Sequence, residues 1–175
     1  SVLEHYGIVT LLYGTLLPGP DIGMRCADQL RSVRDAGFET GIHTWDHVKW
    51  QDGVLKADAE WTREQMQRAC DRYQQIFGEK ARVHGAAGWQ MNRHSYRLTQ
   101  QLGFEYCSDT RGDCPFIPII NGEIIACPQL PTTLPTLDEL IGVGNITVDN
   151  VAEHLLKLSA DHRPSGHVYT LHAEL

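Results

Sequence analysis

The sequence lacks several features that would place it in a specialised class of proteins. It has five cysteines, an odd number, and no Cys-x-x-Cys pair, so we expect neither a disulfide framework nor a cysteine-rich zinc site. No apolar run approaches the roughly 20 residues that a membrane-spanning helix needs. A serine nucleophile elbow and a glycine-rich phosphate loop are also missing. These absences favour a globular domain from a reducing compartment, with most thiols acting as small apolar side chains.

Basic residues are also in short supply. The 15 Lys and Arg residues face 22 Asp and Glu residues, which gives a formal net charge of −7. This balance argues against nonspecific binding to nucleic acid, so no nucleic-acid partner is expected. The length of 175 residues and the hydrophobic share of 42% are typical of one globular domain with its own core, here residues 1–175.

Helical and strand-like patterns alternate along the chain. The helical patterns cover residues 24–36, residues 62–77 with Thr62 as the cap, residues 92–102 with Asn92 as the cap, and a stretch capped by Thr147. The strand-like runs cover residues 38–42, 82–87, 104–107, a pair within 115–127 that turns at Asn121-Gly122, and 168–172. Such alternation predicts an α/β fold with parallel strands, whose functional groups gather at the carboxyl ends of the strands.

Two histidines stand where the first of these strands ends. His43 and His47 are four residues apart, a spacing that places two side chains on one side of a helical turn. A pair of neutral imidazoles at a strand end is a good beginning of a divalent metal site. Asp46, between them, would either orient a ligand or cap a nearby N–H group. Trp89, Asp109 and His172 fall at or just past other strand ends, so we expect them on the same rim.

In this order, the motifs resemble the polysaccharide deacetylase (NodB-homology) family. The second motif of that family is H-[ST]-x-x-H, which residues 43–47 match, and its last motif ends in Leu-His, as Leu171-His172 does. Longer stretches are similar to the bacterial branch that removes a formyl group from an undecaprenyl-phosphate-linked 4-formamido-arabinose in lipid A modification. These stretches are residues 41–47, 86–89, 108–112, 130–136 and 169–174.

The resemblance implies a deformed (β/α) barrel of the polysaccharide deacetylase type. The first motif of the family, an Asp-x-Asp near the start, does not precede His43 in this sequence. By resemblance, we therefore expect residues 1–175 to be a fragment that lacks the first strand and the last helix, so that the barrel is incomplete at both ends. The third protein ligand of the metal, an Asp, and the catalytic base would then lie outside this chain.

The chemistry that the resemblance implies is metal-dependent hydrolysis of an amide. His43 and His47 would hold a divalent metal, zinc by default for two imidazoles and a carboxylate, which would activate water. His172 would be the catalytic acid that protonates the departing amine. A backbone N–H near Gly88 and Trp89 would stabilise the oxyanion.

Substrate contacts are expected from Gly88, Trp89, Asp109 and Arg111. Trp89 would be a wall against the sugar ring, or else a core aromatic side chain. Arg111 would hold the substrate phosphate or orient the catalytic carboxylate, since this sequence lacks the Arg-Pro motif that the family carries in its third position. The alternative for Asp109 and Arg111 is a structural salt bridge.

The resemblance also suggests partners and a location. The substrate would be a lipid-linked N-acyl amino sugar, which places the protein peripherally on a membrane surface, on the cytoplasmic side of the bacterial inner membrane. A second interpretation is a deacetylase of another N-acyl sugar or polysaccharide. A third is a catalytically incomplete carbohydrate-binding domain that holds no metal.

Overall fold

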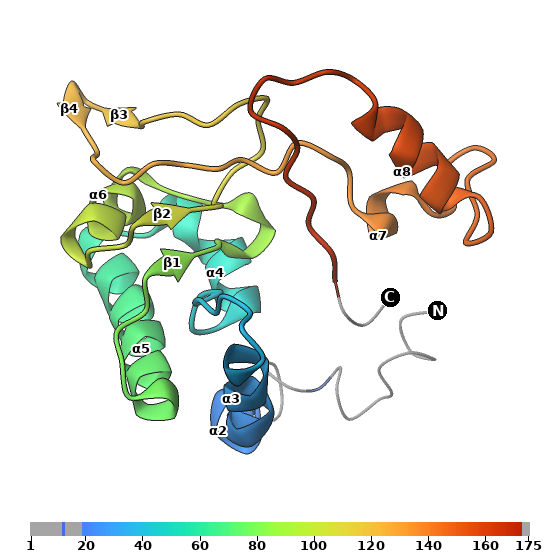
Figure 1. Cartoon of the computed structure of the whole chain (residues 1–175). Helices are drawn as coiled ribbons and strands as arrows, with labels where there is room; N and C mark the ends of the chain where they lie inside the picture. The colour runs from blue at the N-terminus through green and yellow to red at the C-terminus, as the bar shows by residue number, and fades with distance from the viewer. Residues whose placement is uncertain (1–11, 13–18, 173–175) are drawn as a thin grey trace.

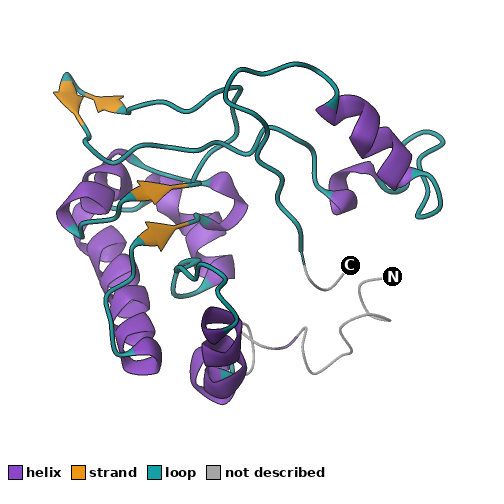
Figure 2. Cartoon of the chain, viewed as in Figure 1, coloured by secondary structure: helices purple, strands orange, loops and turns teal. Residues whose placement is uncertain are grey.

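The structure is a computed structural model that describes Leu12 and residues 19–172. Helices dominate it and the strands are short (Figure 2). The helices are α2 (Ile22–Arg25), α3 (Ala27–Asp35), α4 (His47–Gly53), α5 (Ala59–Phe77), α6 (Arg93–Gln101), α7 (Leu137–Leu140) and α8 (Val151–Ser159), with 3₁₀ turns η1 (Val54–Lys56) and η2 (Ala87–Trp89). The strands are β1 (Val83–His84), β2 (Tyr106–Cys107), β3 (Ile119–Ile120) and β4 (Glu123–Ile124).

Parallel backbone segments lie side by side in the order in which they occur along the chain. Ile42 pairs in parallel with β1, β1 with β2, and β2 with Gln129. Further along, the N–H of Thr133 donates to the carbonyl of Val168 over 2.9 Å. Sequential neighbours joined in parallel through helical crossovers are the arrangement that the predicted α/β fold requires.

The predicted strands are shorter than expected, and one of them does not form. The run 38–42 contributes the single paired residue Ile42, and 168–172 forms no regular strand. Its Val168 N–H donates to the side-chain oxygen of Thr133 at 2.9 Å instead of to a carbonyl, which interrupts a regular ladder. The hairpin within 115–127 is confirmed as antiparallel β3 and β4. Its turn has positive φ at both Asn121 and Gly122, as a two-residue hairpin turn favours.

The long predicted helix is confirmed as α5, although its start is not where the pattern placed it. Asp58 is the cap, and its carboxylate accepts the N–H of Trp61 at 2.9 Å. Thr62 lies inside the helix, where its hydroxyl donates to the carbonyl of Asp58. Gly78 ends the helix with φ of +75°, as predicted. The cap of α6 at Asn92 is also confirmed, with its side chain accepting two backbone N–H groups.

Two other helices differ from the prediction in their bounds. The expected helix 24–36 is divided into α2 and α3 at Cys26, which caps the second of them. Helix α8 begins at Val151 with Asn150 in the cap position, three residues after the predicted cap Thr147. Asn150 still contacts that residue, because its side chain accepts the N–H of Thr147 at 2.8 Å.

The core lies between β1, β2 and the helices α4, α5 and α6, which gather on one side of the molecule (Figure 1). Trp50 of α4 and Met66 of α5 are fully buried there, and the indole of Trp50 donates to the carbonyl of Gln90 at 2.8 Å. Helices α7 and α8 lie on the other side, joined to the rest by long loops.

Candidate functional site

His43 and His47 are neighbours in space, but their backbone is not one helical turn. The chain bends at Thr44, which has φ of +63°, and α4 begins only at His47. The predicted i, i+4 arrangement on one helix is therefore wrong, although the two rings still lie 5.2 Å apart between centroids. Positive φ is strained for a β-branched residue, and such strain concentrates at functional sites.

Asp46 caps α4. Its carboxylate accepts the backbone N–H of Lys49 at 3.1 Å and lies 3.5 Å from the Lys49 ammonium. Of the two interpretations for this side chain, the structure shows the capping one. The cap fixes where the helix starts, and with it the position of His47.

The imidazole of His43 is oriented by the strand beside it. Its Nδ1 lies 2.8 Å from the carbonyl oxygen of Gly85, so Nδ1 carries the proton and the lone pair of Nε2 stays free, as in many metal-binding histidines. Burial lowers the pKa of His43, the Gly85 carbonyl opposes this, and the charges of His47, His84 and His172 lower it further. The residue nevertheless reaches solvent. A neutral, oriented and accessible imidazole fits a metal ligand.

The position of His43 depends on the close approach of the segment before it to β1. A Cβ atom on Gly41 would lie 2.5 Å from Cγ2 and 2.7 Å from the carbonyl oxygen of Val83, so no larger residue fits without displacing one segment. The contact lets Ile42 pair with β1, and the N–H of Gly85 then donates to the carbonyl of Ile42 at 3.0 Å.

The structure brings His172 to the same region as the histidine pair. Its charge is among those that lower the pKa of His43, so the two imidazoles lie within electrostatic range of one another. Its Nδ1 lies 2.9 Å from a carboxylate oxygen of Asp138 in α7. The carboxylate accepts the Nδ1 proton, which leaves Nε2 of His172 as the nitrogen that can exchange a proton with a substrate.

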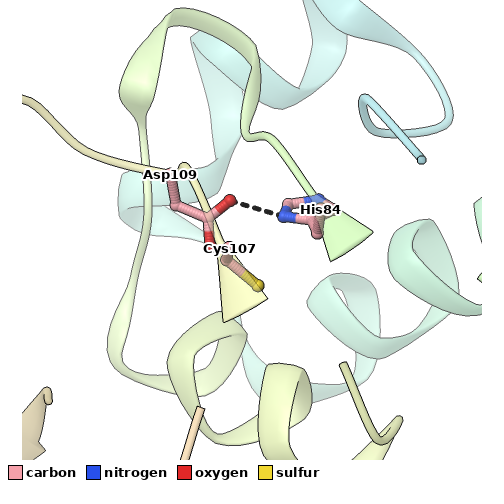
Figure 3. Close-up of side chains that lie close together, drawn as sticks. All are labelled: His84, Cys107 and Asp109. Carbon is pink, nitrogen blue, oxygen red and sulfur yellow. Dashed lines mark hydrogen bonds and ion pairs between the residues drawn. The ribbon is translucent and has the colours of Figure 1, made fainter. Parts of the chain in front are cut away.

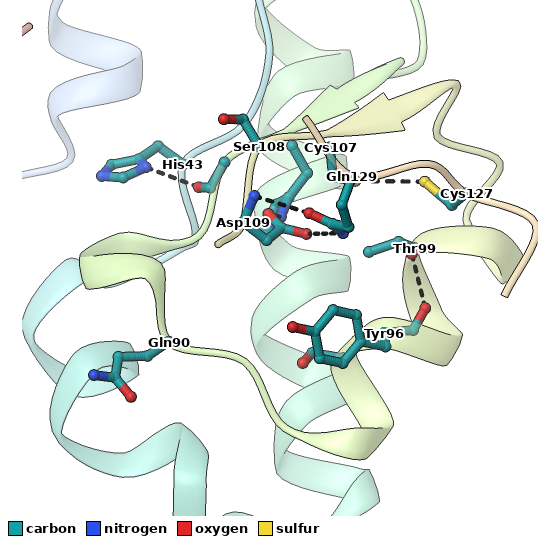
Figure 4. Close-up of polar contacts among 12 residues, drawn as sticks. His43, Gln90, Tyr96, Thr99, Cys107, Ser108, Asp109, Cys127 and Gln129 are labelled. Carbon is teal, nitrogen blue, oxygen red and sulfur yellow. Dashed lines mark hydrogen bonds and ion pairs between the residues drawn. The ribbon is translucent and has the colours of Figure 1, made fainter. Parts of the chain in front are cut away.

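A second histidine site, to which the sequence interpretation gave no role, lies in the core (Figure 3). His84 at the end of β1 and Asp109 after β2 are both fully buried, and Nδ1 of His84 lies 2.6 Å from Asp109 Oδ1. Gln129 donates to Oδ2 of Asp109 and accepts its backbone N–H, both at 3.0 Å (Figure 4). The predicted contact between Asp109 and substrate is therefore not what the structure supports, because this carboxylate is enclosed and both its oxygens are bonded.

Within the described part of the chain, His84, Cys107 and Asp109 form the one group of three or more such side chains whose possible ligand atoms all lie within 4.8 Å of one another. These atoms are already bonded among themselves and to Cys127, whose sulfur lies 3.5 Å from that of Cys107. That contact and burial raise the pKa of Cys107, whereas a metal needs the thiolate. We therefore interpret the group as a hydrogen-bonded core. Nε2 of His84 is buried with no partner among the described residues.

Trp89 and Arg111 are stacked on one another. The Arg111 guanidinium carbon lies 3.9 Å from the centroid of the Trp89 ring, and the indole N–H donates to Thr132 Oγ1 at 3.0 Å. Arg111 forms its ion pair with Glu139, not with Asp109, whose partners are His84 and Gln129. Asp109 and Arg111 thus each have a structural partner, but the predicted salt bridge between them does not form.

The backbone at Gly88 and Trp89 belongs to the 3₁₀ turn η2, which departs from helical geometry at Gly88. The N–H of Trp89 donates to the carbonyl of Ala86 at 3.2 Å. Gly88 has φ of +59° and is the position at which this turn changes direction.

A depression of about 700 Å³ opens on the surface between α4, η1 and the start of α5. The predicted site residues do not line it; its walls are Val48, Lys49, Asp52, Gly53, Lys56, Ala57, Asp58 and Trp61. The exposure of His43 and His47, not a deep cavity, therefore marks the candidate site.

Sequence reasoning missed Asp138 and Glu139, the α7 carboxylates that contact His172 and Arg111. A signal existed for the helix, because Thr136 and Glu139 have the spacing of a capping box. Glu139 indeed accepts the N–H of Thr136 at 3.0 Å. Nothing local indicated which residues the carboxylates would meet, since the partner of Asp138 is 34 positions away.

Comparisons with known proteins agree on one family. Residues 12–107 match the family model described as polysaccharide deacetylase. A protein of Shewanella sediminis named as the probable 4-deoxy-4-formamido-L-arabinose-phosphoundecaprenol deformylase ArnD is 39% identical over 97% of this chain and 54% of its own length. A protein of the same name from Wigglesworthia glossinidia brevipalpis is 30% identical over 97% of this chain and 59% of its own length. The chain thus spans little more than half the length of these relatives.

Solved structures support the fold. The crystal structure of a polysaccharide deacetylase from Mycobacterium smegmatis superimposes with a TM-score of 0.68 at 22% identity, covering 99% of this chain and 61% of that one. The allantoinase PuuE gives a TM-score of 0.52 at 23% identity, over 64% of this chain and 36% of that one. Such likeness establishes a shared mixed helix and sheet architecture.

Proposed function

Since the chain belongs to the polysaccharide deacetylase family, we propose that it is a metal-dependent amide hydrolase that removes the formyl group from an undecaprenyl-phosphate-linked 4-formamido-arabinose in lipid A modification. The acyl group and the lipid-linked sugar come from the names of the relatives, which match 97% of this chain. The chemistry is supported by one observation above all: His43 and His47 are exposed with their rings 5.2 Å apart, and the Gly85 carbonyl orients His43.

His43 and His47 would hold the cation, with zinc as the default identity. The fit rests on Nδ1 of His43, which the Gly85 carbonyl occupies, and on the lowered pKa that keeps this ring neutral. A catalytic zinc site usually keeps three protein ligands, and the third is proposed to be an Asp outside residues 1–175. When bound, the cation would activate water and polarise the acyl oxygen.

His172 would deliver a proton to the departing amine. Asp138 accepts from Nδ1 at 2.9 Å, which holds the ring in one orientation, as carboxylates do for catalytic histidines. Nε2 then donates the proton. The N–H of Gly88 would donate to the acyl oxygen as negative charge develops there, and Trp89 would border the sugar.

A lipid-linked substrate implies work at a membrane surface. None of the helices in residues 19–172 has the length and hydrophobicity of a membrane span. We therefore propose peripheral attachment, on the cytoplasmic side of the inner membrane, where a lipid-linked intermediate and a reducing environment coincide.

The proposal is tested with the protein at its natural length. Release of formate from a lipid-linked formamido-arabinose is compared with release of acetate from the matched acetamido sugar, and bound metal is measured by elemental analysis. His43→Ala and His47→Ala should each lose the metal and lower kcat/KM by more than about 100-fold, since even a lost partner of a ligand typically costs about 10–100-fold. His172→Ala should keep the metal and lose about 10²–10⁴-fold in kcat.

His162→Ala is the matched control, because His162 is exposed and lies outside the site. Acetate release that exceeds formate release would favour a deacetylase of another N-acyl sugar. Equal metal content in all variants, with no hydrolysis of either sugar, would leave the carbohydrate-binding domain as the better interpretation.

A further inference from the structure

The positive charge of Arg111 is already engaged within the protein. Its Nη2 donates to both carboxylate oxygens of Glu139, at 2.6 and 2.5 Å, and its Nη1 donates to the carbonyl of Leu134 at 3.0 Å. The flat guanidinium rests on the ring of Trp89. A side chain engaged through both terminal nitrogens and one face is poorly placed to bind a substrate phosphate.

Glu139 belongs to α7, a helix of only four residues. A helix of this length is not stable by itself and depends on contacts from outside. The carboxylate of Glu139 supplies two of them, one to Arg111 and one to the N–H of Thr136 at 3.0 Å. Burial alone would raise the pKa of Glu139, and the Thr136 amide and Arg111 lower it instead. The carboxylate is therefore charged and anchors the helix to Arg111.

Asp138 is the neighbour of Glu139 in the same four-residue helix and holds His172. Because the helix is so short, any movement of Glu139 also moves Asp138. We propose that Arg111 is a positioning residue for His172: it fixes α7 through Glu139 and thereby sets the place of Asp138 and of the imidazole. This inference rests on the proposed function, in which His172 is the acid.

Trp89 is connected to the segment that carries His172 by a second set of contacts. Its indole N–H donates to Thr132 Oγ1, and Thr132 Oγ1 lies 2.8 Å from Thr170 Oγ1. Thr170 is two residues before His172. The stacked pair of Trp89 and Arg111 is therefore connected to the segment that carries His172 in two ways. Trp89 is connected through Thr132 and Thr170, and Arg111 is connected through α7.

The test uses Arg111→Gln, Glu139→Gln and the double variant in the full-length protein. Each single variant should lower kcat about 10- to 100-fold with KM within about twofold, because displacement of a catalytic group by about 1 Å can cost about 100-fold. The double variant should be no worse than the worse single variant, since both changes break one connection. Arg111→Lys, which keeps the charge, should recover part of the loss.

Arg97→Gln is the matched control. Arg97 pairs with Glu123 at 2.5 Å with side-chain exposures of 36% and 47%, close to the 34% and 44% of Arg111 and Glu139. It contacts the β3–β4 hairpin instead of α7, so kcat should stay within about twofold of the unaltered protein.

A second readout does not need activity. Long-range ¹H–¹⁵N spectra of the imidazoles report which nitrogen of His172 carries the proton. At a pH where the imidazole is neutral, the unaltered protein should show a single Nδ1–H form, and Arg111→Gln should show mixed forms, as Asp138→Asn should. If neither sugar is hydrolysed by any protein, the proposed function fails while these spectra still decide the positioning role.

Two results would overturn the inference. One is a large rise in KM at unchanged kcat in Arg111→Gln, which would mean that Arg111 binds the substrate. The other is an unaltered His172 spectrum in both Arg111→Gln and Glu139→Gln.

Discussion

The protein contains two groups of residues that look like beginnings of a metal site, and they differ in what surrounds them. His84 and Asp109 are fully buried and bonded to one another and to Gln129. His43 and His47 face solvent at a bend of the chain, and His43 is held by the carbonyl of Gly85. The first group has nearly all its donors and acceptors satisfied internally, whereas the second leaves Nε2 of His43 open.

The difference shows that closeness of ligand atoms does not by itself identify a metal site. In the buried group, the closeness is explained by hydrogen bonds, and the raised pKa of Cys107 opposes metal binding. In the exposed pair, a carbonyl orients one ring and leaves its other nitrogen open. The buried group should therefore matter for stability and the exposed pair for function.

The largest expected effect is on stability, from Asp109→Ala. The change leaves His84 and Gln129 buried without their partner, and loss of one member of a buried pair typically costs about 3–5 kcal/mol. Urea unfolding of the full-length protein measures it. Asp113→Ala is the control, since Asp113 has a side chain that is 89% exposed, and it should change the free energy of unfolding by less than about 0.5 kcal/mol. A similar small loss for Asp109→Ala would contradict the structural role.

Gly41→Ala should have the next largest effect. The added Cβ would lie 2.5 Å from a side-chain atom of Val83, and overpacking of this kind typically costs about 1–3 kcal/mol. The same shift should displace His43 and weaken metal binding. Gly19→Ala provides the comparison, because a Cβ there meets nothing within 4 Å. Thermal unfolding and metal titration of both variants would check this, and equal behaviour would show that the close approach is unimportant.

His43→Ala and His47→Ala should hardly change stability in metal-free protein. Both residues are exposed, and surface substitutions usually stay within about 0.5 kcal/mol. Urea unfolding with a chelator present isolates this effect from metal binding. A loss of several kcal/mol in either variant would mean that the pair, like His84 and Asp109, belongs to the core.

The smallest expected effect is a change in the pKa of Asp138 when His172 is replaced. Burial would raise the pKa of Asp138, but polar contacts with Thr136 and His172 hold it below its ordinary value. The contribution of this carboxylate to stability is therefore present above its unfolded-state pKa and is lost as pH falls through the native value. His172→Ala should raise the pKa of Asp138, as followed by carboxyl ¹³C NMR, while His162→Ala should not. An unchanged value would show that the contact with His172 does not form in solution.

Much of the fold could be predicted because its signals are local. Asn92 as a cap, Gly78 as a helix end and the turn at Asn121 and Gly122 each depend on the chemistry of a few adjacent residues. The boundary of α5 was wrong because Asp58 and Thr62 are both good caps, and only packing of the first turn decides between them. The strand at 168–172 was wrong because its partner atoms are Thr133 side-chain and backbone groups far away in sequence.

The order of motifs and the choice of His43 and His47 as candidate metal ligands followed from the sequence alone, since they depend on residue type and spacing. Which histidine is buried against a carboxylate, which carboxylate meets His172, and what neutralises Arg111 were decided by the tertiary structure. Those partners are 25, 34 and 28 positions away. Packing of β1, β2 and α7 brings them together, and no local pattern records the outcome of that packing.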